Sequence, residues 1–213
     1  SKKNLFNIDN LSVKDIDENS ELIPLMTPED EIEINKEELP LTLPILSLRN
    51  TVLFPGVVIP ITASRNKSIK LIKDANNFNK LLGVVSQKDE KIEDPKSNDI
   101  FKIGTVAKIL KVLQMPDGNT TVIIQGKRRF EIDRIISEKP YITANIKSSP
   151  EVNPGPKNSE FTATIDSIKD LALEIIKRNP NIPSEEVFAI KNIESNSFLI
   201  NFVSSNLNLP VID

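Results

Sequence analysis

The stretch from Leu39 to Ser64 constrains the fold of this chain more than any other part of the sequence. It contains two apolar segments, Leu43–Leu48 and Val57–Ala63, joined by a short connection that includes Phe54-Pro55-Gly56. Short apolar runs bounded by proline and glycine are typical of buried strands, so both segments are predicted to be strands. Because Pro60 has no N–H to donate, the second strand is expected at a sheet edge or a bulge.

Residues 1–38 differ sharply from the rest of the chain in charge. They carry four lysines against eleven acidic residues, a net charge of −7, while the whole chain has a net charge of only −3. The segment shows no sustained helical or strand period, so it is predicted to be an acidic, largely flexible N-terminal arm. Docking of this arm on a neighbouring subunit, through the apolar cluster Leu22–Met26, stays open as the alternative.

A single helix is predicted after the second strand, from about Arg65 to Phe78, with Ser64 as its capping residue. Lysines at helical spacing are expected to point to water, and apolar residues to pack on the sheet. The expected inward-facing residues are Ile69, Ile72, Ala75 and Phe78.

Strand patterns then dominate as far as residue 148. Five further strands are predicted at Leu81–Ser86, Lys102–Gln114, Thr120–Gln125, Phe130–Ser137 and Tyr141–Ser148. A charged loop over 87–99 and turn residues at Met115–Asn119 separate some of them. Many short strands around one helix favour a closed or half-closed barrel, because closure protects sheet edges. Residues 39–148 are therefore predicted to form one β-rich domain.

The pattern changes after residue 148. Residues 149–158 are predicted to be a linker, because proline, glycine and asparagine dominate them. Residues 159–213 are predicted to be all-α, with helices over Ser159–Arg178, after Ser184, and after Ser195 or Asn196. Three short helices bury little apolar surface alone, so this subdomain is interpreted as the truncated start of a helical bundle. The expected fold class is α+β.

The composition excludes several kinds of catalytic site. The chain has no histidine and no cysteine, which rules out a Ser-His-Asp triad and a thiolate zinc site. No G-x-x-x-x-G-K-[ST] motif is present, and the acidic pairs lie in predicted loops. We therefore expect no catalytic, cofactor or metal site in this chain. No apolar run is long enough for a transmembrane helix, so no membrane partner is expected.

Two predicted turns place an apolar residue beside proline, at Phe54 and at Met115. An exposed apolar residue at a loop tip can bind unfolded polypeptide. We therefore predict polypeptide contacts at Phe54, Val57 and Met115, with Arg65 and Lys67 as a charged rim. For Phe54 the alternative, in which the turn folds back and buries the ring, stays open.

The one basic run is Lys127-Arg128-Arg129, between two predicted strands. No aromatic residues interleave with it for base stacking, so it is interpreted as a solvated strand end and not as a phosphate site. The chain after residue 38 has a net charge of only +4, which gives no support to DNA binding.

The residues from Leu43 to Ile72 resemble the opening of the N-terminal domain of Lon, a family of ATP-dependent bacterial proteases. The matching motifs are Leu48-Arg49-Asn50, Phe54-Pro55-Gly56, Ile59-Pro60 and Arg65-Asn66-Lys67-Ser68-Ile69. Further segments follow the family in the same order, namely Val84–Pro95, Ile100–Ile132 and Phe198–Leu209. The acidic lead-in Leu22–Glu31 is similar to Lon proteins of the Bacteroidetes type, and the resemblance covers roughly residues 22–210.

This resemblance implies a PUA-like pseudo-barrel followed by a helical subdomain. It also implies a parent enzyme, an ATP-dependent serine protease with a Ser-Lys dyad and an AAA+ ATPase that uses ATP and Mg²⁺. That family degrades misfolded and regulatory proteins as cytoplasmic homo-hexamers, and DNA binding is possible within it. Its catalytic and nucleotide-binding motifs lie beyond Asp213, so none is carried onto this chain.

What the resemblance assigns to this part is the recognition and holding of substrate polypeptide, together with support for hexamer assembly. Two alternatives stay open: a chiefly structural role in subunit contacts, and a stand-alone Lon-like ligand- or protein-binding domain without protease activity.

Overall fold

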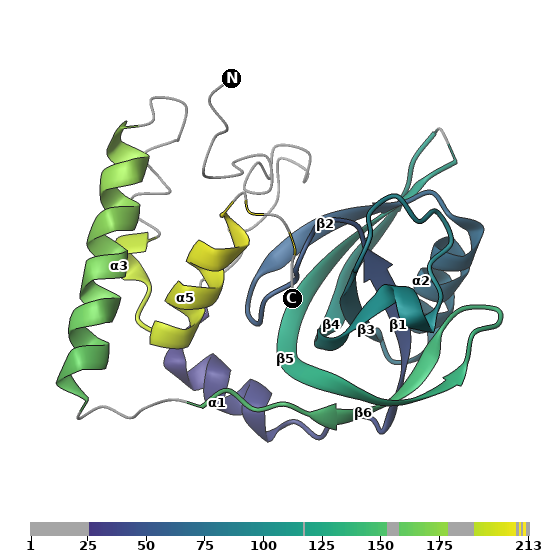
Figure 1. Ribbon diagram of the computed structural model, residues 1–213, viewed down its shortest axis with the longest axis horizontal. Helices are drawn as coiled ribbons and strands as arrows, with labels where there is room; N and C mark the ends of the chain where they lie inside the picture. The colour runs from purple at the N-terminus through teal and green to yellow at the C-terminus, as the bar shows by residue number, and fades with distance from the viewer. Residues whose placement is uncertain are drawn as a thin grey trace. The chain divides into compact units, whose positions relative to one another are not determined.

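The computed structural model describes residues 26–116, 118–152, 158–178 and 190–207, together with Leu209 and Val211. The chain divides into two compact units, which are drawn in Figure 1. The described parts of Ser1–Asn35 and Glu151–Asn208 form the helical unit, and those of Lys36–Pro150 and Leu209–Asp213 form the sheet unit. The predicted α+β class is therefore confirmed.

Six strands form one sheet in the sheet unit. They are β1 (Thr42–Leu48), β2 (Val58–Ala63), β3 (Leu81–Gln87), β4 (Ile100–Gln114), β5 (Thr120–Ser137) and β6 (Thr143–Ser148). Their order is β2-β5-β4-β3-β1-β6, and β5 pairs with β6 as well, so five of the strands close a ring. Only β1 and β3 pair in parallel among these strands. The closure expected from many short strands is observed.

Strand β2 lies at the end of the strand order and pairs with β5 alone among the described strands. The Gly126 amide donates to the Val57 carbonyl at 2.9 Å, just before β2 begins. Hydrogen bonding alternates along an antiparallel pair, so Pro60, three residues on, turns its backbone nitrogen away from β5. The edge position predicted from Pro60 is confirmed.

Strand β5 corrects the prediction of two separate strands at Thr120–Gln125 and Phe130–Ser137, because the chain forms one strand of 18 residues. The basic run lies inside this strand, where Arg129 pairs with Thr105 of β4. Lys127 lies 3.9 Å from the carboxylate of Glu37, and Arg128 donates to the backbone carbonyl of Glu37. These polar contacts let Lys127 and Arg128 lie within a half-buried strand, so the run is not a strand end.

Helix α2 (Asn66–Phe78) has almost the predicted bounds, but Arg65 is its N-cap and no side chain caps it, so the role predicted for Ser64 is wrong. Leu71, Ile72 and Ala75 are buried, whereas Phe78 is 87% exposed. The residues predicted to face inward are spaced three apart, and each step of three falls about 60° short of a full helical turn. By Phe78 the side chain has therefore turned away from the buried face of the helix.

The core of the sheet unit gathers around Phe130, which is fully buried on β5. A Cβ added at Gly83 or at Gly104 would lie within 2.9 Å of the Phe130 ring, so these two positions leave the room that the ring occupies. The other buried members of this core are Leu43, Ile45, Val85, Ile100, Val106, Ile132, Ile142, Ala144 and Ile146.

The helical unit contains α1 (Pro28–Lys36), α3 (Ser159–Arg178) and α5 (Asn196–Ser205), and residues 190–192 are also helical. The bounds predicted for α3 are observed. Ser195 caps α5, since its hydroxyl accepts from the Phe198 amide at 3.0 Å. Ser184 and residues 153–157 of the predicted linker lie outside the described residues. The buried apolar residues of this unit include Ile34, Ile165, Ala172, Ile176, Ile190, Ile193, Phe198 and Leu199.

Helix α1 lies within the segment predicted to be an acidic arm without a helical period. Its first turn forms a capping box: the Thr27 hydroxyl accepts from the Asp30 amide at 3.2 Å, and the Asp30 carboxylate accepts from the Thr27 amide at 2.9 Å. The Ser195 hydroxyl donates to the carboxylate of Glu31 at 2.7 Å, which ties α1 to the start of α5. The described end of the arm is thus an ordered helix in the helical unit.

Candidate functional site

The β1–β2 connection (residues 49–57) is held by three strands of the sheet. Ser86 of β3 donates its hydroxyl to the Thr51 carbonyl at 2.6 Å, and Thr105 of β4 donates to the Leu53 carbonyl at 2.6 Å. The Gly56 amide donates to the carbonyl of Gly126 on β5 at 2.9 Å. Bonds from separate strands fix the path of this connection even though it has no regular secondary structure.

The backbone of β5 approaches this connection closely at Gly126. A Cβ at Gly126 would lie 2.2 Å from the Phe54 carbonyl oxygen, a distance that no side chain can occupy. The Phe54 side chain is half-buried, and Leu53 and Pro55 on either side of it are buried. Val57, the second residue predicted to contact polypeptide, is only 7% exposed. Phe54 is therefore partly exposed, which lies between the exposed and the buried arrangements considered for it.

Met115 lies in a different loop, at the turn between β4 and β5. Its amide donates to the Asn119 carbonyl at 2.9 Å, its carbonyl accepts from Gly118 at 3.0 Å, and its side chain is 43% exposed. Phe54 contacts the strand near Gly126, whereas Met115 lies beyond Thr120. Since a strand rises about 3.3 Å per residue, roughly 20 Å of β5 separates the two places. The structure does not bring Phe54 and Met115 together.

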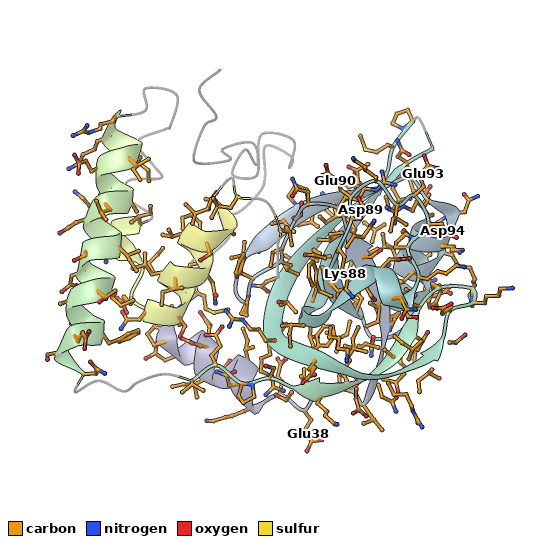
Figure 2. The ribbon with its side chains drawn as sticks, in the orientation of Figure 1. Glu38, Lys88, Asp89, Glu90, Glu93 and Asp94 are labelled. Atoms are coloured by element: carbon orange, nitrogen blue, oxygen red, sulfur yellow. The ribbon has the colours of Figure 1, made fainter. Side chains whose placement is uncertain are left out.

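Arg65 and Lys67 lie at the start of α2. The partner of Lys67 lies in the loop after β3, and the partner of Arg65 is the last residue of β3. The Lys67 ammonium donates to both oxygens of Asp94, at 2.8 and 2.7 Å. This hydrogen bond holds the pKa of the Asp94 carboxyl below its ordinary value. Arg65 donates to the side-chain carbonyl of Gln87 at 2.8 Å. Figure 2 labels Asp94 and Glu93 in the charged loop that supplies the contact to Lys67.

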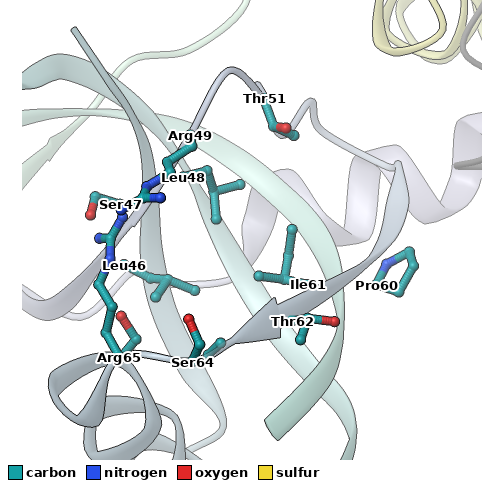
Figure 3. A pocket seen from close by; sticks show the side chains of 12 residues that line it. Leu46, Ser47, Leu48, Arg49, Thr51, Pro60, Ile61, Thr62, Ser64 and Arg65 are labelled. Atoms are coloured by element: carbon teal, nitrogen blue, oxygen red, sulfur yellow. The ribbon is translucent and has the colours of Figure 1, made fainter. Parts of the chain in front are cut away.

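A pocket of about 280 Å³ lies between the end of β1, β2 and the start of α2. Figure 3 shows Arg49 and Arg65 entering it from two sides, with their guanidinium groups near Ser47. The residues that line it are Leu46, Ser47, Leu48, Arg49, Thr51, Pro60, Ile61, Thr62, Ala63, Ser64, Arg65 and Ser68. None of them is acidic, so the pocket combines an apolar wall with hydroxyl and guanidinium donors.

Arg49 is the residue that sequence reasoning missed, because it entered only as part of the Leu48-Arg49-Asn50 motif. Arg49 follows β1 and Arg65 precedes α2, with β2 between them in the chain, so no local pattern predicts that the two meet. They meet because β1 ends beside the first turn of α2. Burial is the main cause that lowers the pKa of the Arg65 guanidinium, and the positive charge of Arg49 lowers it further. The negative charges of Asp94 and Glu93 act to raise this pKa.

Other kinds of site find no support among the described residues. No group of three acidic side chains in the described ranges is arranged to hold a metal ion. Among the helices that the structure describes, none combines the length and the apolar composition that a bilayer crossing requires.

A family model described as the ATP-dependent protease La (LON) substrate-binding domain matches residues 42–213. The chain is 66% identical to the Lon protease of Flavobacterium johnsoniae over 211 residues, which cover 99% of this chain and 26% of that protein. It is 49% identical to the Lon protease of Cytophaga hutchinsonii over 193 residues, covering 91% and 24% of the two chains. The chain thus spans about a quarter of the length of the curated relatives it matches.

Among solved structures, the N terminal domain of a Mycobacterium avium complex Lon protease matches with a TM-score of 0.61. The match covers 76% of this chain and 80% of that one at 22% sequence identity, which supports the fold alone.

Proposed function

This chain belongs to the Lon substrate-binding domain family, and on that premise we propose that it recognises and holds substrate polypeptide for an ATP-dependent protease. The substrates of that protease would be misfolded and regulatory proteins. The observation that carries the proposal is the family match over residues 42–213, which includes the whole sheet of the sheet unit.

Within the sheet unit, the exposed apolar contacts would be Met115 and the accessible part of Phe54. Arg65 and Lys67 would form the charged rim at the start of α2. Val57 is buried, and its amide donates to the Phe54 carbonyl at 3.2 Å, so its contribution would be to hold the connection that carries Phe54.

The test is binding of this chain to a denatured, carboxymethylated protein, with the native form of that protein as the control. A photo-crosslinking residue placed at 115 or at 54 should crosslink to the denatured form only. The proposal fails if the chain neither binds the denatured protein nor crosslinks to it from either position.

For the whole protein we propose a serine protease with a Ser-Lys dyad and an AAA+ ATPase that uses ATP and Mg²⁺, assembled as a cytoplasmic homo-hexamer. The high identity to two Lon proteases supports this proposal. Determining the gene sequence after the codon for Asp213 tests it, because a G-x-x-x-x-G-K-[ST] motif is expected there. A stop codon at that place would favour the stand-alone alternative.

The finer description of the fold is also a proposal. We assign the closed ring of five strands to a PUA-like pseudo-barrel, and the helical unit to the start of a larger helical bundle. The pairing of β5 with both β4 and β6 supports the first assignment. The second is supported by Leu171 on α3, which is 59% exposed and would be covered by a further helix.

A role in subunit contacts is the second candidate, and the same exposed Leu171 favours it. If the isolated chain associates through α3, Leu171→Glu should reduce the mass measured by light scattering. An unchanged mass would count against contacts at this face. DNA binding gains no support, because Lys127 and Arg128 of the basic run contact Glu37.

A further inference from the structure

Two guanidinium groups reach the same small pocket in the sheet unit, and none of the described residues that line it is acidic. We propose that this pocket binds one carboxylate group of an extended substrate polypeptide, through Arg49 and Arg65. The carboxylate would come from an acidic side chain or from the chain terminus of the substrate. This inference rests on the proposed function, since it assigns the chemistry that the substrate-binding unit recognises.

Arg65 is held in place before any ligand arrives. Its Nη2 donates to the Oε1 atom of Gln87, a side chain that is only 3% exposed. The amide nitrogen of Gln87 donates in turn to the carbonyls of Asp89 and Ile92, at 3.2 and 2.9 Å. These bonds fix which end of the Gln87 amide faces Arg65. The guanidinium is therefore oriented by a buried neighbour, which reduces the conformational entropy that binding would cost.

The second cation is more accessible. Arg49 follows the last residue of β1 and is exposed, and Figure 3 shows its guanidinium directed toward that of Arg65. Two like charges that share a pocket repel each other, and the lowered pKa of Arg65 reflects this repulsion in addition to burial. An anion between them would relieve it. An arginine fork matches the two oxygens of a carboxylate in spacing and plane.

The surroundings favour a singly charged group over a phosphate or a nucleic acid. The negative charges of Glu93 and Asp94 raise the pKa of Arg65, whereas the positive charge of Arg49 lowers it. These two carboxylates therefore limit the positive potential at the pocket. The pocket also has an apolar, buried part to its lining, with Leu46, Leu48 and Ala63 each at most 5% exposed. Such a lining suits the methylene stem of an acidic residue or an apolar neighbour in the same peptide.

The probe is a short fluorescent peptide rich in leucine and valine, with one central glutamate and both ends blocked. Three matched peptides replace the glutamate by glutamine, by phosphoserine, or by glutamine with a free C-terminal carboxylate. Fluorescence anisotropy with the 213-residue chain gives the dissociation constant of each. The blocked glutamate peptide and the free-carboxylate peptide should each bind about tenfold more tightly than the blocked glutamine peptide.

The main variant is Arg49→Gln, because Arg49 is exposed and its replacement leaves the buried contacts of the sheet unit intact. It should weaken binding of the glutamate peptide about tenfold and leave binding of the glutamine peptide unchanged. Lys73→Gln is the matched control, since it removes one exposed positive charge from α2 outside the pocket. It should leave both dissociation constants unchanged. Arg65→Gln should resemble Arg49→Gln, with circular dichroism as the check that it folds.

Three results would overturn the proposal. Equal binding of the glutamate and glutamine peptides would show that the pocket does not distinguish a charged side chain from a neutral one. The proposed function would not be contradicted, because peptide still binds. Tighter binding of the phosphoserine peptide, with competition by inorganic phosphate, assigns the pocket to phosphate. Absence of binding by every peptide also overturns it. Binding of the chain to the denatured, carboxymethylated protein then shows whether the proposed function fails as well.

Discussion

Two loops of the sheet unit carry an apolar residue beside proline, and the structure treats them differently. The β1–β2 connection is tied by Ser86, Thr105 and Gly126 to three different strands, and Phe54 within it is half-buried. The β4–β5 turn is held by its own backbone hydrogen bonds, and Met115 is 43% exposed. The same local sequence pattern therefore produced one packed loop and one exposed tip.

The two loops differ in how far along the chain their hydrogen-bond partners lie. The β4–β5 turn joins neighbouring strands, so its bonds are local and its tip extends beyond the sheet. The β1–β2 connection joins strands that are not neighbours, so it must cross the sheet, and it passes within bonding distance of β3, β4 and β5. Stability changes should therefore concentrate in the first loop and binding changes in the second.

The largest effect should follow Gly126→Ala. The added methyl group would meet the Phe54 carbonyl oxygen at 2.2 Å, and the backbone there cannot give way without breaking the bonds of the connection. We expect a loss of about 2–3 kcal/mol in the free energy of unfolding, measured by urea titration. In the other loop Gly118→Ala meets no atom within 4 Å, and its φ of +86° alone should cost about 1 kcal/mol. Equal losses for the two variants would contradict the contrast.

Next in size is Thr105→Val, which removes the hydroxyl that donates to the Leu53 carbonyl. Thr105 is 3% exposed, so the carbonyl would be left without its partner in a buried place. The expected loss is about 1–3 kcal/mol in the free energy of unfolding. Thr121→Val is the matched control, because the Thr121 hydroxyl bonds to Thr62 at the surface. This substitution should change stability by less than about 0.5 kcal/mol. A stable Thr105 variant would mean that the connection is held without this bond.

Met115→Ser should separate binding from stability. The side chain is exposed at the turn, so the free energy of unfolding should change by less than about 0.5 kcal/mol. Affinity for denatured protein should fall several-fold if Met115 is an anchor, as measured by fluorescence anisotropy. Phe54→Ser should lower both quantities, since that ring is half-buried. A Met115 variant that loses stability but keeps its affinity would reverse the assignment of the two loops.

The smallest effect concerns the charged rim. Lys67 and Asp94 are both more than half exposed, so Lys67→Gln should cost at most about 0.5 kcal/mol and less in high salt. The hydrogen bond from Lys67 holds the pKa of the Asp94 carboxyl below its ordinary value. Its contribution to stability is therefore fully present above the ordinary pKa and is lost as the pH falls through the lowered pKa. The free energies of unfolding measured by urea titration at pH 7 and at pH 2.5 should therefore differ less in the Lys67→Gln variant than in the unsubstituted chain.

Local periodicity predicted most of the fold. The strand at Leu43–Leu48, the helix after Arg65 and the long helix α3 each follow from a pattern contained in a few turns or residues. The single strand β5 was not predictable in this way. Its basic run resembled a strand end, and the polar contacts of Lys127 and Arg128 come from Glu37, which is distant in the sequence.

Helix α1 has a helix-start pattern in its own sequence. Thr27-Pro28-Glu29-Asp30 combines a capping residue, proline at the first helical position and an acid that returns the hydrogen bond. The high negative charge of the segment masked this pattern. The pocket, in contrast, had no local signal. Arg49 and Arg65 belong to a strand end and a helix start, and only the tertiary structure brings them together.

The closure of the ring has a consequence for synthesis on the ribosome. Thr42 of β1 pairs with Asn145 of β6, 103 residues later in the chain. At about 5–20 residues per second, β6 is translated roughly 5–20 seconds after β1. During that interval one edge of β1 has no partner strand, and the buried Leu43 has no complete core to enter. The sheet unit therefore completes its fold only after nearly all of it has been translated.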